Sequence, residues 1–290
     1  MDVGQKEGLV FFSNPLMSDI ESSWSPIHDA AFNGRLLTLQ RLIAQGACVN
    51  MSTQEQVLPL HGACLQGHTA CAKLLLEHGA IVNTPTVDGQ TALTEACARG
   101  HVTCVSLLLQ HRATTLGTCK TSSAIHRAAA AGQTECIETL VQYGADLDQH
   151  IPSLGSPLHV ACSNQRLKAV TKLLQLGASV NSCINGTSPL HIAARLSSPE
   201  LVSVLLEHGA DHCLSNSEGK RPVDFAPAGS LAETMLRQAG GVFPLMQLCR
   251  MCIRRSVGRQ RLSGIHHIPL PTDLIKYLLY QSALEGEVTT

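Results

Sequence analysis

The stretch Ser188-Pro-Leu-His191 and five close copies of it decide the fold of this chain. The copies are Ser25-Pro-Ile-His28, Leu58-Pro-Leu-His61, Thr91-Ala-Leu-Thr94, Ser123-Ala-Ile-His126 and Ser156-Pro-Leu-His159, and their fourth positions are 32 or 33 residues apart. A second landmark keeps the same phase: Gly46-Ala47, Gly79-Ala80, Arg112-Ala113, Gly144-Ala145, Gly177-Ala178 and Gly209-Ala210. Two landmarks that stay in phase over six copies indicate a repeat architecture.

Each repeat is predicted to fold as a helix, a turn, a second helix and a loop. Ser at the first motif position is a favoured N-cap, and Pro after it suits the first helical residue, where no N–H is needed. Apolar residues at helical spacing, such as Cys104, Leu107 and Leu108, predict the second helix. The Gly of Gly-Ala can adopt the left-handed conformation that ends a helix. One such helix pair is too small to bury its own apolar face, so the sequence predicts an all-α solenoid of stacked repeats.

Three repeats depart from the pattern. In the third, Thr94 replaces His and Arg112 replaces Gly, so we expect a weaker hydrogen-bond network in its first helix and a less sharply ended second helix. In the fifth and sixth, Gln165 and Ser197 stand where the turn Gly lies elsewhere. None of these changes alters the spacing of the repeats.

The composition limits the classes of function. Aromatic residues make up 3% of the 290 residues, which favours thin helical layers over one thick core. The net charge of −1 argues against a general binder of nucleic acids or anionic membranes. No apolar run reaches the roughly 18 residues that a membrane span needs. Nothing near the start looks like a secretory signal, so we expect a cytoplasmic protein whose 12 Cys are reduced.

The many His residues invite a metal-site hypothesis, and the repeat argues against it. Five of them occupy one equivalent position per repeat: His28, His61, His126, His159 and His191. Stacked helices lie ~8–10 Å apart, whereas two ligands of one zinc ion lie within ~4 Å of each other. We therefore expect each of these His to bond the backbone within and between repeats.

Most Cys residues also follow the repeat. They fall into two phases, one of Cys64, Cys97 and Cys162 and one of Cys71, Cys104 and Cys136. Such positions predict small buried packing residues. Cys249 and Cys252 form a lone C-x-x-C, which supports zinc only weakly because no second pair lies in range. The sequence therefore predicts no catalytic residue, no metal and no cofactor, and we expect a protein that is not an enzyme.

The repeat phase ends after Gly240-Gly241, and a basic segment follows. Residues 1–240 carry 15 Lys and Arg against 19 Asp and Glu, whereas residues 241–290 carry 6 against 3. Leu245, Cys249 and Ile253 share one face of a predicted helix, and arginines mark its other side: Arg250, Arg254 and Arg255. A second helix is predicted from about Thr272, as its N-cap, to Leu279. Taken alone, these helices fit a cap over the open end of the solenoid.

The repeats resemble the ankyrin repeat over roughly residues 24–235, and Gly219–Asp224 resembles a truncated closing repeat. The segment Pro244–Ile253 resembles the elongin-binding box of the SOCS box, in which Leu, Cys and an aliphatic residue are separated by three residues each. Ile268-Pro-Leu-Pro271 resembles the cullin box, with Ile268 in place of the usual Leu. The chain is identified as a member of the ankyrin repeat and SOCS box family.

The resemblance implies a division of the chain into four parts. Residues 1–23 form an extended or disordered N-terminal arm, and residues 24–240 hold six ankyrin repeats and the closing repeat. Residues 241–280 form a small helical SOCS box, with the elongin-binding box at 244–253 and the cullin box at 268–279. Residues 281–290 form a tail.

The resemblance also implies a function. Members of the family act as the substrate-recognition subunit of a ubiquitin ligase, in which elongin B and elongin C bind the SOCS box and cullin-5 brings its RING subunit. This chain would then promote ubiquitination and degradation of a target. The implied elongin-binding residues are Leu245, Leu248, Cys249, Cys252 and Ile253. The implied cullin-binding residues are Ile268, Pro269, Leu270, Pro271, Leu274 and Tyr277. The alternative is an ankyrin scaffold or inhibitor that binds its target without ubiquitination.

The target surface is expected at the loop tips between repeats, where the sequence repeats least, although some of these loops can be merely solvated. The residues chosen there are Gln56, Asp88, His150, Ile151 and Asn185. The arm has several large apolar residues without any period, so it is either disordered or folds along a partner. Leu16, Met17 and Asp19 are chosen as its contacts. The resemblance to one family member suggests a cytosolic target, creatine kinase.

Overall fold

The computed structural model describes residues 24–116, 123–239, 245–258, 265 and 269–280, with only the backbone of residues 245–247 and of Arg255. The chain divides into two compact units, Met1–Ala124 and Ile125–Thr290, which are described one after the other. Within the described residues the regular elements are helices, and no strand is formed, which confirms the predicted all-α class.

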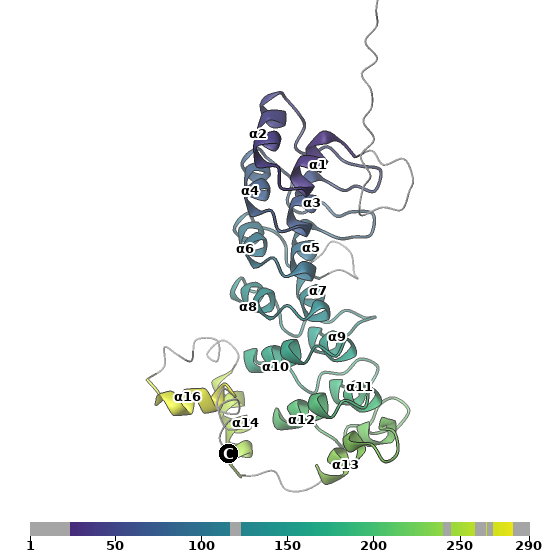
Figure 1. Ribbon diagram of the computed structural model, residues 1–290. Coiled ribbons are helices and arrows are strands. Elements are labelled where there is room, and N and C mark those ends of the chain that lie inside the picture. The colour runs from purple at the N-terminus through teal and green to yellow at the C-terminus, as the bar shows by residue number, and fades with distance from the viewer. Residues whose placement is uncertain (1–23, 117–122, 240–244, 259–264, 266–268, 281–290) are drawn as a thin grey trace, which may run out of the picture. The chain divides into compact units, whose positions relative to one another are not determined.

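The first unit contains three helix pairs. Its helices are α1 (Pro26–Phe32), α2 (Leu36–Ala44), α3 (Pro59–Leu65), α4 (Thr69–Glu77), α5 (Ala92–Arg99) and α6 (Val102–Gln110). The first helices of the pairs, α1, α3 and α5, pack side by side in one row, and α2, α4 and α6 form a second row (Figure 1). Leu60 and Leu93 in the first row and Leu75 and Leu108 in the second are fully buried. The core is therefore a thin apolar layer between two rows of short helices.

The second unit continues the same pattern and then leaves it. Its repeat helices are α7 (Ala124–Ala131), α8 (Thr134–Gln142), α9 (Pro157–Ser163), α10 (Leu167–Leu176), α11 (Pro189–Arg195) and α12 (Pro199–Glu207). The 3-10 helix η1 (Pro222–Phe225) packs on α11, and α13 (Leu231–Gln238) packs on α12. The closing repeat thus keeps both of its helices, with the first reduced to one short turn. Beyond it lie α14 (Leu245–Val257) and α16 (Thr272–Leu278), which pack on each other (Figure 1).

The repeated His residues join neighbouring repeats, as predicted. In His159, Nδ1 accepts the backbone N–H of Ser156 at 3.2 Å, and Nε2 lies 3.2 Å from the carbonyl oxygen of Thr187, 28 residues on. The other four rings reach the carbonyl oxygens of Val57, Thr84, Gly155 and Lys220 at 3.0–3.1 Å. In the third repeat, the hydroxyl of Thr94 accepts the N–H of Thr91 at 2.8 Å. Thr therefore preserves the local half of the network.

The turns without Gly close in the same way as the turns with Gly. Arg112, Gln165 and Ser197 have φ of 63°, 54° and 51°, all in the left-handed region. The N–H of Arg112 bonds to Leu109 O at 3.1 Å, which matches the bond from Gly79 to Leu76 O at 3.1 Å. The prediction of a less sharply ended helix in the third repeat is therefore wrong. The left-handed conformation costs about 1–2 kcal/mol for a side chain with Cβ, and the turn hydrogen bonds form in spite of this cost.

The Cys residues of both phases are buried in the helices, as predicted. Burial raises the pKa of the Cys162 thiol to about 12, which keeps it protonated and unreactive. Hydrogen bonding from Cys64 lowers the pKa of Cys104 to about 7, but Cys104 is fully buried and out of reach of a substrate. None of the helices that the structure describes combines the length and the apolar character required to cross a lipid bilayer.

Candidate partner-binding surfaces

Helix α14 presents one set of its apolar side chains to solvent. Leu248 is 42% exposed and Ile253 is 38% exposed, and Cys249 and Cys252 are exposed between them. A surface helix of a globular domain normally turns such a face inward, toward the core. Leu245 begins the helix, but its side chain lies outside the described residues. Four of the five residues chosen for elongin binding therefore form one exposed apolar face.

The basic side of α14 is the side that packs against the repeats. One guanidinium nitrogen of Arg254 donates to the carbonyl oxygens of Leu174 at 2.7 Å and Gln175 at 3.1 Å. The other donates to the carbonyl oxygen of Leu278, in the last turn of α16. The carbonyl groups at a helix C-terminus have no partner in their own helix and carry partial negative charge, so they favour a cation there. Arg254 thus binds the ends of α10 and α16 together, and the predicted second side of the helix is the side that meets the rest of the chain.

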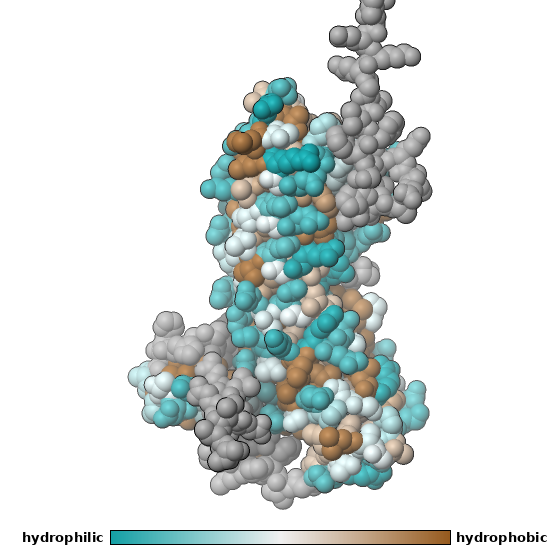
Figure 2. Space-filling view, in the orientation of Figure 1, coloured by the Kyte–Doolittle hydropathy of each residue, from teal (hydrophilic) through white to brown (hydrophobic). Residues whose placement is uncertain are grey.

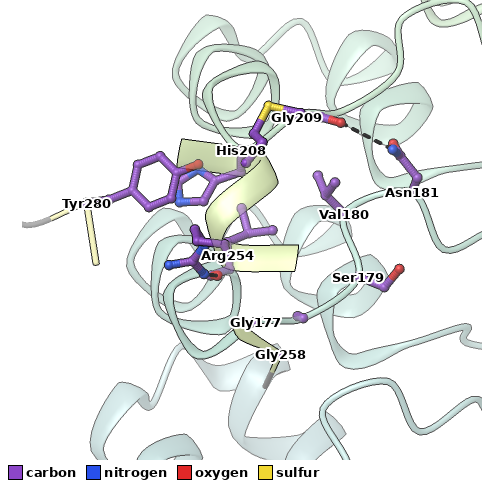
Figure 3. A pocket seen from close by; sticks show the side chains of 12 residues that line it. Gly177, Ser179, Val180, Asn181, His208, Gly209, Arg254, Gly258 and Tyr280 are labelled. Carbon is purple, nitrogen blue, oxygen red and sulfur yellow. Dashed lines mark hydrogen bonds between the residues drawn. The ribbon is translucent and has the colours of Figure 1, made fainter. Parts of the chain in front are cut away.

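Aromatic rings extend this contact. Tyr280 stacks on His208 with ring centroids 3.7 Å apart, and its hydroxyl donates to Glu207 O at 3.2 Å (Figure 3). The guanidinium of Arg250 lies 3.8 Å from the centroid of the Tyr277 ring. The pKa of His208 is lowered to about 4, chiefly by burial and to a smaller extent by the nearby Arg254 and Arg250. His208 is therefore neutral at pH 7, which lets it lie beside two arginines without charge repulsion.

A cavity of about 420 Å³ lies where α14 and Tyr280 meet the repeats. Its walls come from the turn Gly177–Asn181, from Met251 and Arg254 of α14, and from Tyr280 (Figure 3). The charged group of Arg254 and the hydroxyl of Tyr280 are already bonded to backbone carbonyls. These two residues of the cavity walls therefore help to hold α14 on the repeats.

The residues chosen for cullin binding divide into two groups. Leu270, Leu274 and Tyr277 pack against a small core of Ile265, Ile275 and Leu278, so they also stabilise the SOCS box. Pro269 and Pro271 are exposed, and Ile268 lies outside the described residues. Helix α16 begins at Thr272 with Pro271 as its N-cap, one residue earlier than the N-cap predicted from the sequence. The exposed part of this group is the extended segment ahead of α16.

In the first unit, two loop residues chosen for target binding lie on neighbouring hairpins. Gln56 and Asp88 are both exposed. The N–H of Val87 bonds to Glu55 O at 3.0 Å, so the two hairpin tips are in direct contact. Val87 itself is 66% exposed. Asp88 was the residue chosen from this turn, and its exposed aliphatic neighbour Val87 was not chosen.

In the second unit, the structure corrects one residue. His150 and Asn185 are exposed, but Ile151 is only 4% exposed. The backbone of Ile151 pairs with that of Gly155, which closes the hairpin and turns the Ile side chain inward. The exposed apolar residue of this hairpin is Leu154. Leu16, Met17 and Asp19 of the arm lie outside the described residues. On the face seen in Figure 2, hydrophobic and hydrophilic residues are mixed.

Comparison with known proteins identifies both parts of the chain. The ankyrin repeat family model, which holds three copies, matches residues 7–86, 81–151 and 148–216, and the SOCS box model matches residues 241–279. The chain is 54% identical over 277 residues to mouse ankyrin repeat and SOCS box protein 9, which covers 96% of each chain. It is 53% identical over 265 residues to human ankyrin repeat and SOCS box protein 11, covering 91% of this chain and 82% of the relative.

A solved structure supports the same conclusion. The crystal structure of the ankyrin repeat domain of human ankyrin repeat and SOCS box protein 11 aligns with a TM-score of 0.71 at 45% identity. The alignment covers 76% of this chain and 100% of that domain. With the repeats, the C-terminal helices and near full-length relatives all in agreement, the chain belongs to the ankyrin repeat and SOCS box family.

Proposed function

We propose that this chain is the non-catalytic, substrate-recognition subunit of a ubiquitin ligase in the cytoplasm. Its SOCS box, residues 241–280, binds elongin B and elongin C and recruits cullin-5 with its RING subunit. Its repeats, residues 24–240, and its arm, residues 1–23, bind a target protein. Residues 281–290 form a tail outside these contacts. The target is then ubiquitinated and degraded.

The observation that carries the proposal is the exposed apolar face of α14. Leu248, Cys249 and Ile253 lie on a helix that is anchored through its opposite side, by Arg254. An amphipathic helix whose apolar face is unpartnered fits a hydrophobic groove, with side chains one turn apart as anchors. Elongin C is the partner that the SOCS box implies. Leu245 and Cys252 complete the proposed contact.

The extended segment ahead of α16 is the proposed cullin contact. Pro269 and Pro271 are exposed there, and Pro restrains the backbone so that little entropy is lost on binding. Ile268 and Leu270 belong to the same segment. Leu274 and Tyr277 support it from the SOCS box core, so we assign them a double role.

The repeats are the proposed target receptor. Gln56 and Asp88 on one pair of hairpins, and His150 and Asn185 on the hairpins of the second unit, are available for polar contacts. The arm residues Leu16, Met17 and Asp19 are proposed to add to them. Such a receptor does no chemistry, because its effect is to raise the effective concentration of the target near the conjugating enzyme. Creatine kinase is the first target to test.

Co-expression with elongin B and elongin C tests the proposed partner. Full-length chain should co-purify with both, and Cys249→Phe with Ile253→Asp should abolish this, because a bulky ring and a charge then occupy the apolar face. Both side chains are exposed, so the variant should fold. Leu231→Asp is the matched control, since Leu231 is 62% exposed on α13 and outside the proposed contact. Elongins retained by the double variant would show that the elongin assignment is wrong.

An assay of reconstituted ubiquitination distinguishes a ligase subunit from a scaffold or inhibitor. With elongins, cullin-5, its RING subunit and a conjugating enzyme, the wild-type chain should transfer ubiquitin to creatine kinase, and Pro269→Ala with Pro271→Ala should reduce transfer without loss of elongin. Binding of creatine kinase without transfer would favour the scaffold or inhibitor. Failure to bind creatine kinase would reject that target, and a capture experiment from cytosol would then be needed to name another.

A further inference from the structure

One position of the repeat links a repeat to the next by side-chain hydrogen bonds in four of the six copies. It lies four residues after the Gly of Gly-Ala, and it is occupied by Asn50, Asn83, Asp148 and Asn181 in four of the six repeats. Asn181 donates to Gly209 O at 3.2 Å and accepts the N–H of Asp211 at 2.9 Å. Asn50 makes the same two bonds to Gly79 and Ile81, at 2.9 Å and 2.8 Å. An amide is suited to this role because it donates and accepts at once.

The sixth repeat has Cys213 at this position. A thiol is a weak donor and a weak acceptor, so it cannot make the paired bonds of Asn. Unlike the Cys residues of the two helix phases, Cys213 is exposed. Cys213 therefore neither links two repeats by paired hydrogen bonds nor packs in the core.

Two further ligand-type side chains converge on this thiol. The Sγ atom of Cys213 lies 3.4 Å from Nε2 of His212. Oδ1 of Asp211 accepts the N–H of Cys213 at 2.8 Å, which holds the carboxylate beside it. The ligand atoms of the three residues all lie within 4.8 Å of one another, and His212 is half-exposed while the other two are exposed. An ion from solvent can reach all three.

The backbone around this cluster is fixed from both sides. Asn181 of the preceding repeat holds the carbonyl of Gly209 (Figure 3). It also holds the N–H of Asp211. On the other side, Asn216 closes the following hairpin through bonds of 2.9 Å to and from Lys220. Because the segment is already ordered, binding an ion there costs little conformational entropy.

We propose that Asp211, His212 and Cys213 form a zinc site. Thiolate, imidazole and carboxylate are the three ligand types that zinc takes in proteins, at ~2.0–2.3 Å, whereas calcium and magnesium select oxygen ligands. A tetrahedral ion with such bonds needs ligand atoms ~3–4 Å apart, and the Cys–His pair is already at that separation. On binding, the S–H bond of Cys213 breaks, its proton passes to solvent, and the thiolate sulfur bonds the metal. Water takes the fourth position.

Cobalt(II) is the probe for the test, because a cobalt–thiolate bond gives a charge-transfer absorption band that a nitrogen or oxygen ligand does not. Full-length chain, reduced with a phosphine, should develop this band with one equivalent of cobalt and lose it when zinc is added. Cys213→Ser should abolish the band, and His212→Ala should weaken zinc binding at least tenfold. Cys183→Ser is the matched control, since Cys183 is also exposed, in the preceding repeat, and is not part of the cluster.

Two results would overturn the site. One is a band that survives Cys213→Ser and disappears instead in Cys249→Ser with Cys252→Ser. The other is zinc affinity that is the same in wild type and in both site variants. Asp211→Asn removes the carboxylate with little risk of unfolding the loop, because the amide oxygen can still accept the N–H of Cys213. This variant should melt like wild type without metal and bind zinc more weakly, and unchanged zinc affinity would remove Asp211 from the site.

Discussion

Helices α10 and α14 have the same kind of amphipathic pattern, and the molecule uses them in opposite orientations. In α10, the apolar stripe of Ala169, Val170, Leu173 and Leu174 is buried and Lys168 is exposed. In α14, the apolar face around Cys249 is exposed and Arg254 reaches the ends of two other helices. An amphipathic period therefore shows that a helix has two faces, but not which of them meets the rest of the chain.

The difference has an energetic basis. The buried stripe of α10 stabilises the repeats by removing apolar surface from water. The inward side of α14 carries arginines beside Met251 and Val257, and burial of Arg254 is offset by its bonds to carbonyl groups that have no partner in their own helices. Two sets of variants test this contrast directly, and two more test the repeats that α14 is compared with.

The largest effect is expected from truncation of the α10 core. Leu173→Ala should lower the free energy of unfolding by about 2–5 kcal/mol, because Leu173 is fully buried and its removal leaves a cavity. Ile253→Ala on α14 should cost less than about 0.5 kcal/mol, since that side chain is already partly solvated. Urea unfolding of both variants measures the difference. Equal losses would mean that α14 is also packed on its apolar side.

Removal of the α14 anchor should come next. Arg254→Ala should weaken the docking of α14 by about 1.5–3 kcal/mol, because three hydrogen bonds from a charged group are lost. Hydrogen exchange of the amides in α14 and α16 should accelerate, while exchange in α9 stays the same. Arg237→Ala is the control, since Arg237 pairs with Glu233 on the surface of α13. Unchanged exchange in α14 would show that the stack of Tyr280 on His208 is enough to hold this helix on the repeats.

Acid should affect the repeats through their His residues. Burial lowers the pKa of His61 to about 4, below its ordinary value of 6.5, so the unfolded chain takes up the proton first as the pH falls. Stability is therefore complete above pH 6.5 and decreases toward pH 4. Between pH 7 and pH 5, His61 alone should account for about 2 kcal/mol.

The third repeat supplies the matched variant for this test. His61→Thr copies Thr94, which keeps the local bond and cannot titrate. Melting temperatures of this variant should fall less between pH 7 and pH 5 than those of wild type, whatever its stability at pH 7. An identical acid slope would exclude His61 as a source of the effect.

The smallest effect is expected at a turn. Gln165→Gly should raise the stability by about 0.5–1 kcal/mol, because the φ of 54° at this residue is strained for a side chain with Cβ. Gln175→Gly, inside α10, should lower it by about 1 kcal/mol, since Gly is a poor helix former. Thermal unfolding of the two variants gives opposite signs. Destabilisation by Gln165→Gly would mean that the Gln side chain makes a contact worth more than the strain.

The sequence by itself determined the features that recur in every repeat or that depend on a short motif at fixed spacing. The Ser-Pro-Leu-His motif predicts where each first helix begins, and the shared position of His159 and its counterparts predicts bonds to the backbone of the next repeat. The family, and with it the order of repeats and SOCS box, is also readable from short motifs at fixed spacing, because each needs only a few residues in one register.

Only the tertiary structure decided which surfaces are left for partners. Ile151 is turned inward by a hairpin, and Arg112 takes a left-handed conformation at a position where the other repeats have glycine. The orientation of α14 depends on Arg254 meeting Leu174, 80 residues earlier in the chain. A helical period defines directions around one axis only. Which direction becomes buried depends on groups that approach from distant parts of the sequence, and their desolvation is settled only when the chain is folded.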